Sequence, residues 1–386
     1  MPEFSHHTIQ SLPFQMNQNM QPLQAISLFS GAGGIDVGIQ QAGFTVLACV
    51  ESDHYACETL RTNIAREHHS TVVYEEDIRL LDPSEMMEKL GIAEGELDLL
   101  CGGPPCQAFS QIGKRKSLDD ERGLLLFEMV RFAKVLKPKA IMIEQVKGLL
   151  NAPDSKGKVG GVFELLVSEL EALGYIPKWK VVNAAEYGVA QIRQRVFIVA
   201  TLGRNGFQFP PATHAAASNN SVLFSLPAFA TVGDVLQGIG TPERKNGHVP
   251  QHSHLDVTPD GDRFRMNGVP EGSHLAAQHH LPAEQRRNLT KKDTTKFKRL
   301  SRYEPSNTLR CGEIFFHPLE NRYLTPREYM RIHGYPDEYL LSGPIRGRSG
   351  RVRHLDQHRL VANSVPPPVA AALAKEIAYT LRSITS

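Results

Sequence analysis

The chain has 386 residues, 41% of them hydrophobic and 22% charged, with a formal net charge of +2. Such a composition is typical of a soluble globular protein, and the length allows one large domain together with a smaller one. A charge this close to neutral excludes a uniformly acidic or basic surface, so any surface for a polyanion must be local. No stretch approaches the roughly 18 apolar residues that a membrane span needs.

Residues 1–22 lack the charged start and apolar run of a secretory signal, so we expect a poorly ordered leader there. The five cysteines form no Cys-x-x-Cys pair; they are Cys49, Cys57, Cys101, Cys106 and Cys311. An odd and sparse set argues for a reducing compartment and against a disulfide framework or a structural zinc site. We therefore expect a cytoplasmic protein that holds no metal.

From residue 23 to residue 203, short apolar runs alternate with longer amphipathic ones. The apolar runs predict buried strands over residues 25–29, 45–50, 71–74, 97–101, 140–143 and 196–200. The amphipathic runs predict helices over residues 35–42, 55–67, 124–136 and 162–173, and a run opened by prolines predicts another over 365–381. This alternation predicts an α/β protein with a doubly wound, mainly parallel, Rossmann-like sheet.

The sequence changes after about residue 204, where Gly, Pro, His, Asn and Ser become frequent and no helical period is sustained. We expect a second, smaller, loop-rich domain over residues 204–353, with residues 23–203 and 354–386 forming the first domain. Positive charge in the second domain is concentrated at Arg263, Arg265, Arg286, Arg287, Lys291, Lys292, Lys296, Lys298, Arg299 and Arg302, and at Arg346, Arg348, Arg351 and Arg353. Any one of these is more simply a solvated surface residue, but their clustering favours a polyanionic partner.

A glycine-rich segment, Ser30-Gly-Ala-Gly-Gly34, joins the first predicted strand to the first predicted helix. Glycines at such a turn let the backbone approach a ligand and leave the amides of the helix N-terminus free. Glu51 ends the second predicted strand, where a carboxylate can accept hydrogen bonds from ribose hydroxyls. Asp77 and Pro104 follow the third and fourth strands, so all these groups are expected at one edge of the sheet.

Taken singly, Glu51 or Asp77 is equally well explained as a solvated loop acid, but together with the glycines they favour a nucleoside site. The glycines do not have the Gly-x-Gly-x-x-Gly spacing, because Ile35 stands where the third glycine would be. A diphosphate bridge is therefore not indicated, and a cofactor without phosphates, such as S-adenosylmethionine, fits better.

Cys106 follows two prolines that stiffen a turn just after a predicted buried strand. A thiol held there faces a cleft and is a candidate catalytic nucleophile, although an inert, half-buried cysteine is the commoner case. The polar stretch 108–123 that comes next predicts a mobile loop able to contact phosphate. Glu144, at the end of the fifth predicted strand, is the candidate acid partner.

Arg193 and Arg195 precede the last predicted strand and project on one face if the segment is extended. They either hold Glu144 ionically or contact a substrate base and its phosphate. Alone, such a pair is more often a surface feature.

In combination, these segments resemble the DNA cytosine-5 methyltransferases. The resemblance rests on the segments Phe29–Gly34, Pro104–Gln107, Glu144–Val146, Gln191–Arg195, Arg322–Glu328, Gly334–Pro336 and Ala362–Val365, which occur in family order between residues 24 and 381. Three positions depart from the family pattern, since Ser27 stands for Asp, Gln145 for Asn and Ala362 for Gly.

The resemblance implies a reaction in which a cytosine is flipped out of duplex DNA and methylated at carbon 5. It assigns catalysis to Cys106, Glu144, Arg193 and Arg195, with Cys106 attacking carbon 6 and Glu144 acting at ring nitrogen 3. It assigns S-adenosylmethionine binding to Phe29, Gly31, Gly33, Gly34, Glu51, Asp77, Ile78, Pro104, Asn363 and Val365. It places Gln107, Ser110, Lys114, Arg115 and Arg122 in a DNA-contacting loop that closes over the flipped base.

The resemblance further implies that the second domain reads a DNA sequence, which the chain does not reveal. We expect a monomer without a membrane partner. A cognate restriction endonuclease, as a functional and not a physical partner, is a family-level expectation. An RNA cytosine methyltransferase on the same fold is an alternative. A nicotinamide-dependent oxidoreductase leaves the Pro-Pro-Cys segment unexplained, and a non-catalytic DNA-binding module leaves the catalytic motifs unexplained.

Overall fold

A computed structural model describes residues 21–105, 121–154, 156–203, 206–216, 226–244, 252–278, 280–285, 298–311, 314–345, 354 and 356–385. Its centre is a seven-stranded sheet with the order β3-β2-β1-β4-β5-β8-β6. The bounds are β1 (Leu23–Leu28), β2 (Phe44–Glu51), β3 (Val72–Glu75), β4 (Leu99–Gly102), β5 (Ala140–Val146), β6 (Tyr175–Asn183) and β8 (Gln194–Leu202). The α/β prediction is confirmed, and all six predicted strands belong to this sheet.

The sheet is mixed because one strand, β8, runs antiparallel to both of its neighbours, β5 and β6. The strands from β1 to β5 pair in parallel. Only residues 184–193 connect β6 to β8, and a parallel return needs a crossover of a dozen or more residues. The short connection therefore forces the antiparallel arrangement.

Strand β6 was not predicted from the sequence. It lies at the edge of the sheet, where Pro177 interrupts its apolar pattern and Lys178 and Lys180 face partly outward. An edge position tolerates a proline because one side of the strand needs no ladder partner.

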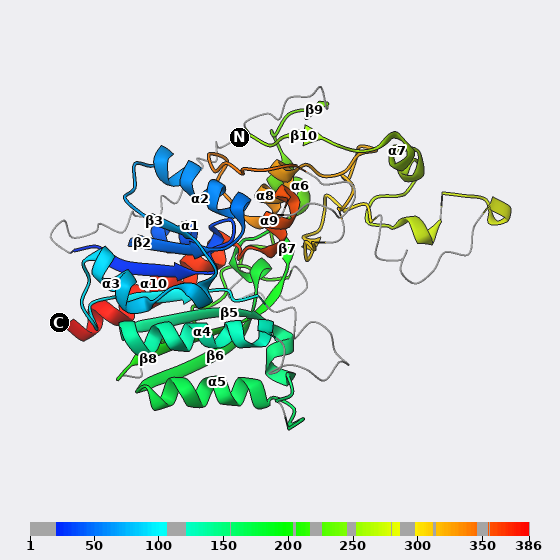
Figure 1. The fold of residues 1–386 in the computed structure, drawn as a ribbon. Coiled ribbons are helices and arrows are strands. Elements are labelled where there is room, and N and C mark those ends of the chain that lie inside the picture. Colours follow the sequence, from blue (N-terminus) through cyan, green and yellow to red (C-terminus); the bar gives the residue numbers. More distant parts are fainter. Residues whose placement is uncertain are drawn as a thin grey trace, which may run out of the picture.

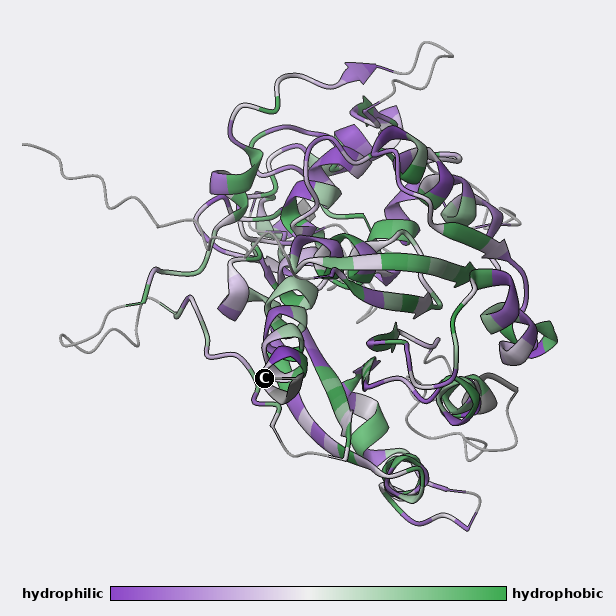
Figure 2. Ribbon diagram, turned by 90° about the vertical axis from the view of Figure 1, so that its left-hand side faces the viewer, coloured by the Kyte–Doolittle hydropathy of each residue, from purple (hydrophilic) through white to green (hydrophobic). Residues whose placement is uncertain are grey.

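Helices cover both faces of the sheet (Figure 1). One face packs against α1 (Gly34–Gln41), α2 (His54–Arg66) and α10 (Pro367–Thr385), and the other packs against α3 (Pro83–Leu90), α4 (Glu121–Leu136) and α5 (Gly161–Ala172). Figure 2 shows that the central strands between these layers are largely hydrophobic. The short helix α3 was not predicted, although Asp82 caps its start, Pro83 opens it and Gly91 ends it with a left-handed φ of 65°.

The C-terminal helix α10 packs against α1 so closely that only glycine fits at two positions. A Cβ on Gly34 would lie 2.1 Å from the carbonyl oxygen of Val365, and one on Gly38 would lie 2.5 Å from the Cβ of Ala370. Both distances are shorter than any ordinary contact, so the missing side chains allow the two backbones to meet.

The described residues between 226 and 345 lie above and to the right of the sheet in Figure 1, and their helices and strands are short. The elements of this region are α6 (Val232–Leu236), β9 (Glu243–Arg244), β10 (Leu255–Asp256), α7 (Asp260–Met266), β11 (Ser306–Asn307) and α8 (Pro326–His333). They pack against β7 (Gln191–Ile192) and α9 (Gln357–Asn363). Strand β11 pairs in parallel with β7, and one hydrophobic cluster joins α6 and α8 to Val37 of α1 and Ala56 of α2. Part of the loop-rich region is thus anchored directly on the sheet domain.

A single buried guanidinium organises the outer part of this region. Arg299 is 4% exposed, and it donates hydrogen bonds to the carbonyl oxygens of Met266, Val269, His317 and Glu320 at 2.7–3.0 Å. Main-chain oxygens from two separate loops therefore satisfy this cation.

No helix in the described parts of the chain combines the length and the apolarity that a bilayer crossing requires.

We predict that Gly38→Ala lowers the free energy of unfolding by about 1–3 kcal/mol, the usual effect of overpacking, because the new methyl group meets the backbone of α10. Gly261→Ala in α7 is the matched control, since a Cβ there meets nothing within 4 Å, and it should be neutral or slightly stabilising. Urea unfolding of both variants checks this. Equal stability of Gly38→Ala and the unchanged protein would contradict the observed helix contact.

Candidate active site

The candidate site lies at the carboxyl ends of β1 and β4, which are neighbours in the sheet although the chain visits β2 and β3 between them. This is the position at which open α/β sheets form a ligand crevice. The glycine-rich loop follows β1, Glu51 ends β2, and Pro104 follows β4. The structure thus brings these three predicted features to one edge.

Glu51 holds the glycine-rich loop in place. Its Oε2 accepts a hydrogen bond from the Gly31 amide at 2.8 Å, and its Oε1 accepts bonds from the amides of Ser52 and Asp53 at 2.8 and 2.7 Å. Burial raises the pKa of Glu51, and these amides counteract the rise. Each carboxylate oxygen has more than one acceptor position, so Glu51 keeps capacity for a ribose hydroxyl.

The loop leaves space beside its backbone. Gly31 has a φ of +55° and a Cβ there would meet nothing within 4 Å, and Phe29 adopts a φ of 56°, which is uncommon for a non-glycine residue. A carboxylate beside the loop accepts from ribose hydroxyls and repels a phosphate. The residues present therefore fit a phosphate-free nucleoside such as the adenosyl group.

The other predicted cofactor residues are distributed unevenly around this edge. Ile78 and Pro104 are buried, whereas Asp77 forms an ion pair with Arg79 at 2.5 Å. Hydrogen bonding to Arg79 lowers the pKa of Asp77. A ligand that uses the Asp77 carboxylate would have to share it with this guanidinium.

The turn after α9 completes the edge from the far end of the chain. Val365 is buried and its carbonyl oxygen touches Gly34, while Asn363 is exposed and its Oδ1 accepts a hydrogen bond from the Cys311 thiol. Both residues were predicted to bind the cofactor. The structure places Val365 against the glycine-rich loop and Asn363 two residues before it, at the end of α9.

Two tyrosines support the loop from behind and were not predicted. The hydroxyls of Tyr335 and Tyr339 donate hydrogen bonds to the carbonyl oxygen of Ala32 at 3.2 and 2.9 Å. The resemblance marks the Gly334-Tyr-Pro336 segment only as a family motif. Its sequence signal carried no information about which loop the hydroxyl would reach.

The acid side of the site is built by parallel pairing of β4 with β5. Gly102 pairs with Ile143, so Glu144 lies beside Gly103, whose added Cβ would be 3.3 Å from the Glu144 Oε2. Gln145 donates a hydrogen bond from Nε2 to the carbonyl oxygen of Pro104 at 2.7 Å. The residue that departs from the family pattern therefore holds the proline turn that leads to Cys106.

The two arginines of the predicted pair point in different directions. Arg195 forms an ion pair with Glu144, with 3.0 Å between Nε and Oε1. Arg193 lies between β7 and β8 and is buried, and its two terminal nitrogens donate to the carbonyl oxygens of Ala362 and Ser364 at 3.0 Å each. Arg195 thus pairs with the acid while Arg193 reaches the turn at residues 362–364, because the segment is not one continuous strand.

Several predicted residues cannot be placed. Cys106, Gln107, Ser110, Lys114 and Arg115 lie outside the described residues, and so does most of the predicted loop over residues 108–123. Arg122 falls in α4, but its side chain is also outside the described set.

Several cations of the loop-rich region are engaged within the protein. Arg263 pairs with Asp256, Arg265 lies 3.4 Å from Asp262, and Arg299 is the buried hub described above. A role for Arg299 in contacting a polyanion is therefore excluded. The cations at residues 286–297 and 346–353 lie outside the described residues.

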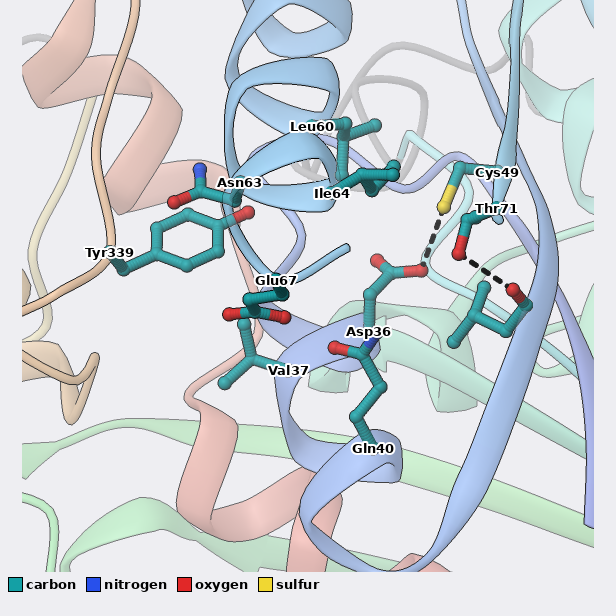
Figure 3. Close-up of a pocket in the computed structure, with 11 residues that line it drawn as sticks. Asp36, Val37, Gln40, Cys49, Leu60, Asn63, Ile64, Glu67, Thr71 and Tyr339 are labelled. Carbon is teal, nitrogen blue, oxygen red and sulfur yellow. Dashed lines mark hydrogen bonds between the residues drawn. The ribbon is translucent and has the colours of Figure 1, made fainter. Parts of the chain in front are cut away.

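A small cavity lies behind the glycine-rich loop, between α1, α2 and β2 (Figure 3). Its volume of about 20 Å³ is enough for one water molecule. Asp36, which is 5% exposed, accepts a hydrogen bond from the Cys49 thiol at 3.2 Å. Its other oxygen has no partner within the described parts of the chain. Burial raises the pKa of Asp36 to about 6.

Comparison with known proteins gives a consistent result over nearly the whole chain. The family model for C-5 cytosine-specific DNA methylase matches residues 23–379. The type II methyltransferase M.NgoFVII of Neisseria gonorrhoeae is 31% identical over 368 residues, which cover 94% of this chain and 88% of that protein. M.PspPI, a type II methyltransferase of Psychrobacter sp. (strain TA137), is 33% identical over 371 residues, covering 93% and 79%.

The fold is also found among solved structures. A crystal structure described as a DNA modification methyltransferase encoded within an E. coli prophage superposes with a TM-score of 0.68 at 22% identity, covering 93% of this chain and 99% of that one. At this identity the match shows a shared fold.

We predict that Asp36→Asn stabilises the protein at high pH. A pKa that rises from 3.8 in the unfolded chain to about 6 in the fold makes the folded state bind the proton more tightly, so stability falls as the pH rises through this window. Above pH 6 the loss is about 3 kcal/mol, and an amide avoids it. Thermal unfolding should therefore show a gain of about 1–3 kcal/mol at pH 8 and no gain near pH 4. A difference that is the same at both pH values would contradict this account.

Proposed function

The chain belongs to the C-5 cytosine-specific DNA methylase family, and we propose that it methylates carbon 5 of a cytosine within a specific sequence of duplex DNA. It is a DNA (cytosine-5)-methyltransferase. The observation that carries the site assignment is the position of Glu144. Its carboxylate is held by Arg195 and lies against Gly103, three residues before Cys106. The acid therefore lies beside the start of the segment that leads, three residues later in the sequence, to Cys106.

Methylation requires carbon 5 of cytosine to act as a nucleophile, but the aromatic ring is unreactive on its own. The Cys106 thiolate attacks carbon 6 of the flipped cytosine, forming a carbon–sulfur bond and moving an electron pair toward carbon 5. Glu144 acts at ring nitrogen 3, where a proton shared between the carboxyl group and the nitrogen stabilises the negative charge that the attack delivers to the ring. Loss of the carbon 5 proton after methylation restores the double bond and expels the thiolate.

Arg195 orients the acid for this task. Its ion pair with Glu144 is largely buried, with side-chain exposures of 19% and 11%, and the bond fixes one carboxylate oxygen so that the other faces the Gly103 side. Proton transfer is efficient only when donor and acceptor are pre-aligned.

S-adenosylmethionine, when bound, supplies an electrophilic methyl group. Glu51 would hold its ribose, the amides after Phe29 would line its amino acid portion, and the turn carrying Asn363 and Val365 would close the site. Asp77, Ile78 and Pro104 complete the proposed contacts.

The loop-rich region over residues 204–353 is proposed to recognise the DNA target and the predicted loop at 108–123 to close over the flipped base. Phosphate contacts would position this domain, and base-edge contacts would select the sequence. Because its relatives are named type II methyltransferases, we propose that the protein acts in the cytoplasm as the modification partner of a restriction endonuclease.

We predict that Cys106→Ser abolishes methyl transfer while S-adenosylmethionine binding stays intact, because a hydroxyl is a much weaker nucleophile toward carbon 6. Transfer of labelled methyl groups to plasmid DNA and calorimetric binding measure the two properties. Turnover at the unchanged rate would sink the nucleophile assignment. A tRNA substrate run in parallel tests the RNA alternative, since methylation of tRNA and not of DNA would replace the proposed substrate.

We predict that Glu144→Gln lowers turnover by about 10²–10⁴-fold, the usual range for a lost acid–base group. Glu164→Gln is the control, because Glu164 is an exposed residue that pairs with Lys158 on the surface, and it should turn over normally. Bisulfite sequencing of DNA methylated by the unchanged enzyme gives the recognition sequence for this assay. Equal loss in both variants would remove the special role of Glu144.

A further inference from the structure

The turn that carries Asn363 and Val365 is fixed from outside rather than by its own secondary structure. It lies between α9, which ends at Asn363, and α10, which begins at Pro367. Within the turn, Ser364 donates from its hydroxyl to the carbonyl oxygen of Val361 at 2.8 Å. The Ser364 carbonyl oxygen accepts two bonds, one from Arg193 and one from His333, each at 3.0 Å. Both acceptor positions of this carbonyl are therefore occupied.

His333 ends α8 and is fully buried, with 0% exposure. Its Nε2 faces the Ser364 carbonyl oxygen, and its Nδ1 lies 2.9 Å from the Gln191 amide nitrogen. Burial and the nearby charge of Arg193 lower the pKa of His333 well below its usual value, so the ring is neutral. The amide of Gln191 donates to Nδ1, which leaves the single ring proton on Nε2 for Ser364.

The chain of bonds continues into the loop-rich region. The other side-chain atom of Gln191, Oε1, accepts a bond from the Leu309 amide at 3.1 Å. Gln191 itself is fully buried and its backbone pairs with Ser306 in the β7–β11 ladder. Three hydrogen bonds in one direction thus connect Leu309 to Gln191, Gln191 to His333, and His333 to Ser364. Buried chains of this kind strengthen each member and tolerate no missing partner.

We propose that His333 is a positioning residue for cofactor binding, which fixes the Asn363–Val365 turn against the glycine-rich loop and links that turn to Ser306–Leu309 of the loop-rich region. This inference rests on the proposed function, because it takes the turn to be part of the S-adenosylmethionine site. Val365 follows Ser364, and its carbonyl oxygen contacts Gly34. A shift of Ser364 would therefore also move the glycine-rich loop. Gln191 and Arg193 anchor the turn and this chain of hydrogen bonds to the sheet domain.

Two amide substitutions at His333 separate the effect of its hydrogen bond to Ser364 from the effect of the packing of its ring. In His333→Gln the amide nitrogen occupies the place of Nε2 and the amide oxygen can accept from Gln191, so both bonds are retained. In His333→Asn the amide is one methylene shorter and reaches Gln191 but not Ser364. Tyr329→Phe removes a different buried bond from the same helix α8, the one between the Tyr329 hydroxyl and the Phe315 amide, and controls for a general loss of stability.

The experiment measures S-adenosylmethionine binding by calorimetry without DNA, and KM and kcat with DNA, for the full chain and the three variants. We expect His333→Asn to weaken cofactor binding about tenfold, the effect of one lost buried hydrogen bond. Its kcat at saturating S-adenosylmethionine should stay within about threefold of the unchanged enzyme. His333→Gln should bind within about twofold, and Tyr329→Phe should bind normally even where its unfolding midpoint falls.

Unchanged binding by His333→Asn overturns the proposal, and so does equal weakening in His333→Asn and His333→Gln, which would assign the effect to ring packing. A fall in kcat with an unchanged KM for the cofactor also overturns it. Failure of the proposed function is a separate result, because in that case the protein without any substitution would not methylate DNA.

Discussion

The contact between the backbones of α1 and α10 is the constraint on which the proposed cofactor-binding edge of the sheet depends. Gly34 and Gly38 allow the start of α1 to meet residues 365–371 at distances that no Cβ permits. This contact brings a turn from the end of the chain to a loop from its beginning. The hydroxyls of Tyr335 and Tyr339 then hold the same loop at Ala32. Without the two glycines, neither the turn nor the tyrosines would have a fixed loop to act on.

Backbone groups hold two of the charged side chains near this edge. Glu51 is held by three amides, and Arg193 by two carbonyl oxygens. Such partners fix a charge in position without cancelling it. Glu144 differs because a cation, Arg195, holds it. A charged partner keeps the carboxylate oriented while leaving its second oxygen available to a substrate.

Much of this arrangement could be predicted from local sequence. Each parallel strand is a short apolar run, and Glu51 and the glycine-rich loop lie at the end of such a run, so both were found by their proximity to a strand end. The unpredicted features depend on contacts between distant segments. The antiparallel direction of β8 follows from a short connection, and β6 is hidden by Pro177 and its lysines. The sequence holds no signal that pairs His333 with Ser364, since the pairing follows from where α8 ends in space.

The different partners of Arg193 and Arg195 also could not be predicted from the local sequence. A spacing of two places both side chains on one face only in a continuous strand, but the ladder breaks between Ile192 and Gln194. One arginine therefore turns to the acid and the other to the closing turn. The pattern identified both residues as important and could not assign their separate tasks.

If the loop-rich region recognises DNA as proposed, the buried guanidinium of Arg299 has a consequence for how that region can change its target. Its acceptors are mainly carbonyl oxygens of residues 266, 269, 317 and 320, and every amino acid supplies that atom. The side chain of Asn321 also accepts a bond from Arg299, at 2.6 Å. Replacing the other side chains of these loops therefore leaves the hub intact, as long as the path of the backbone is kept. Because main-chain atoms hold this region together, its stability depends little on its exposed side chains. Those side chains are therefore free to change and to acquire a new sequence preference.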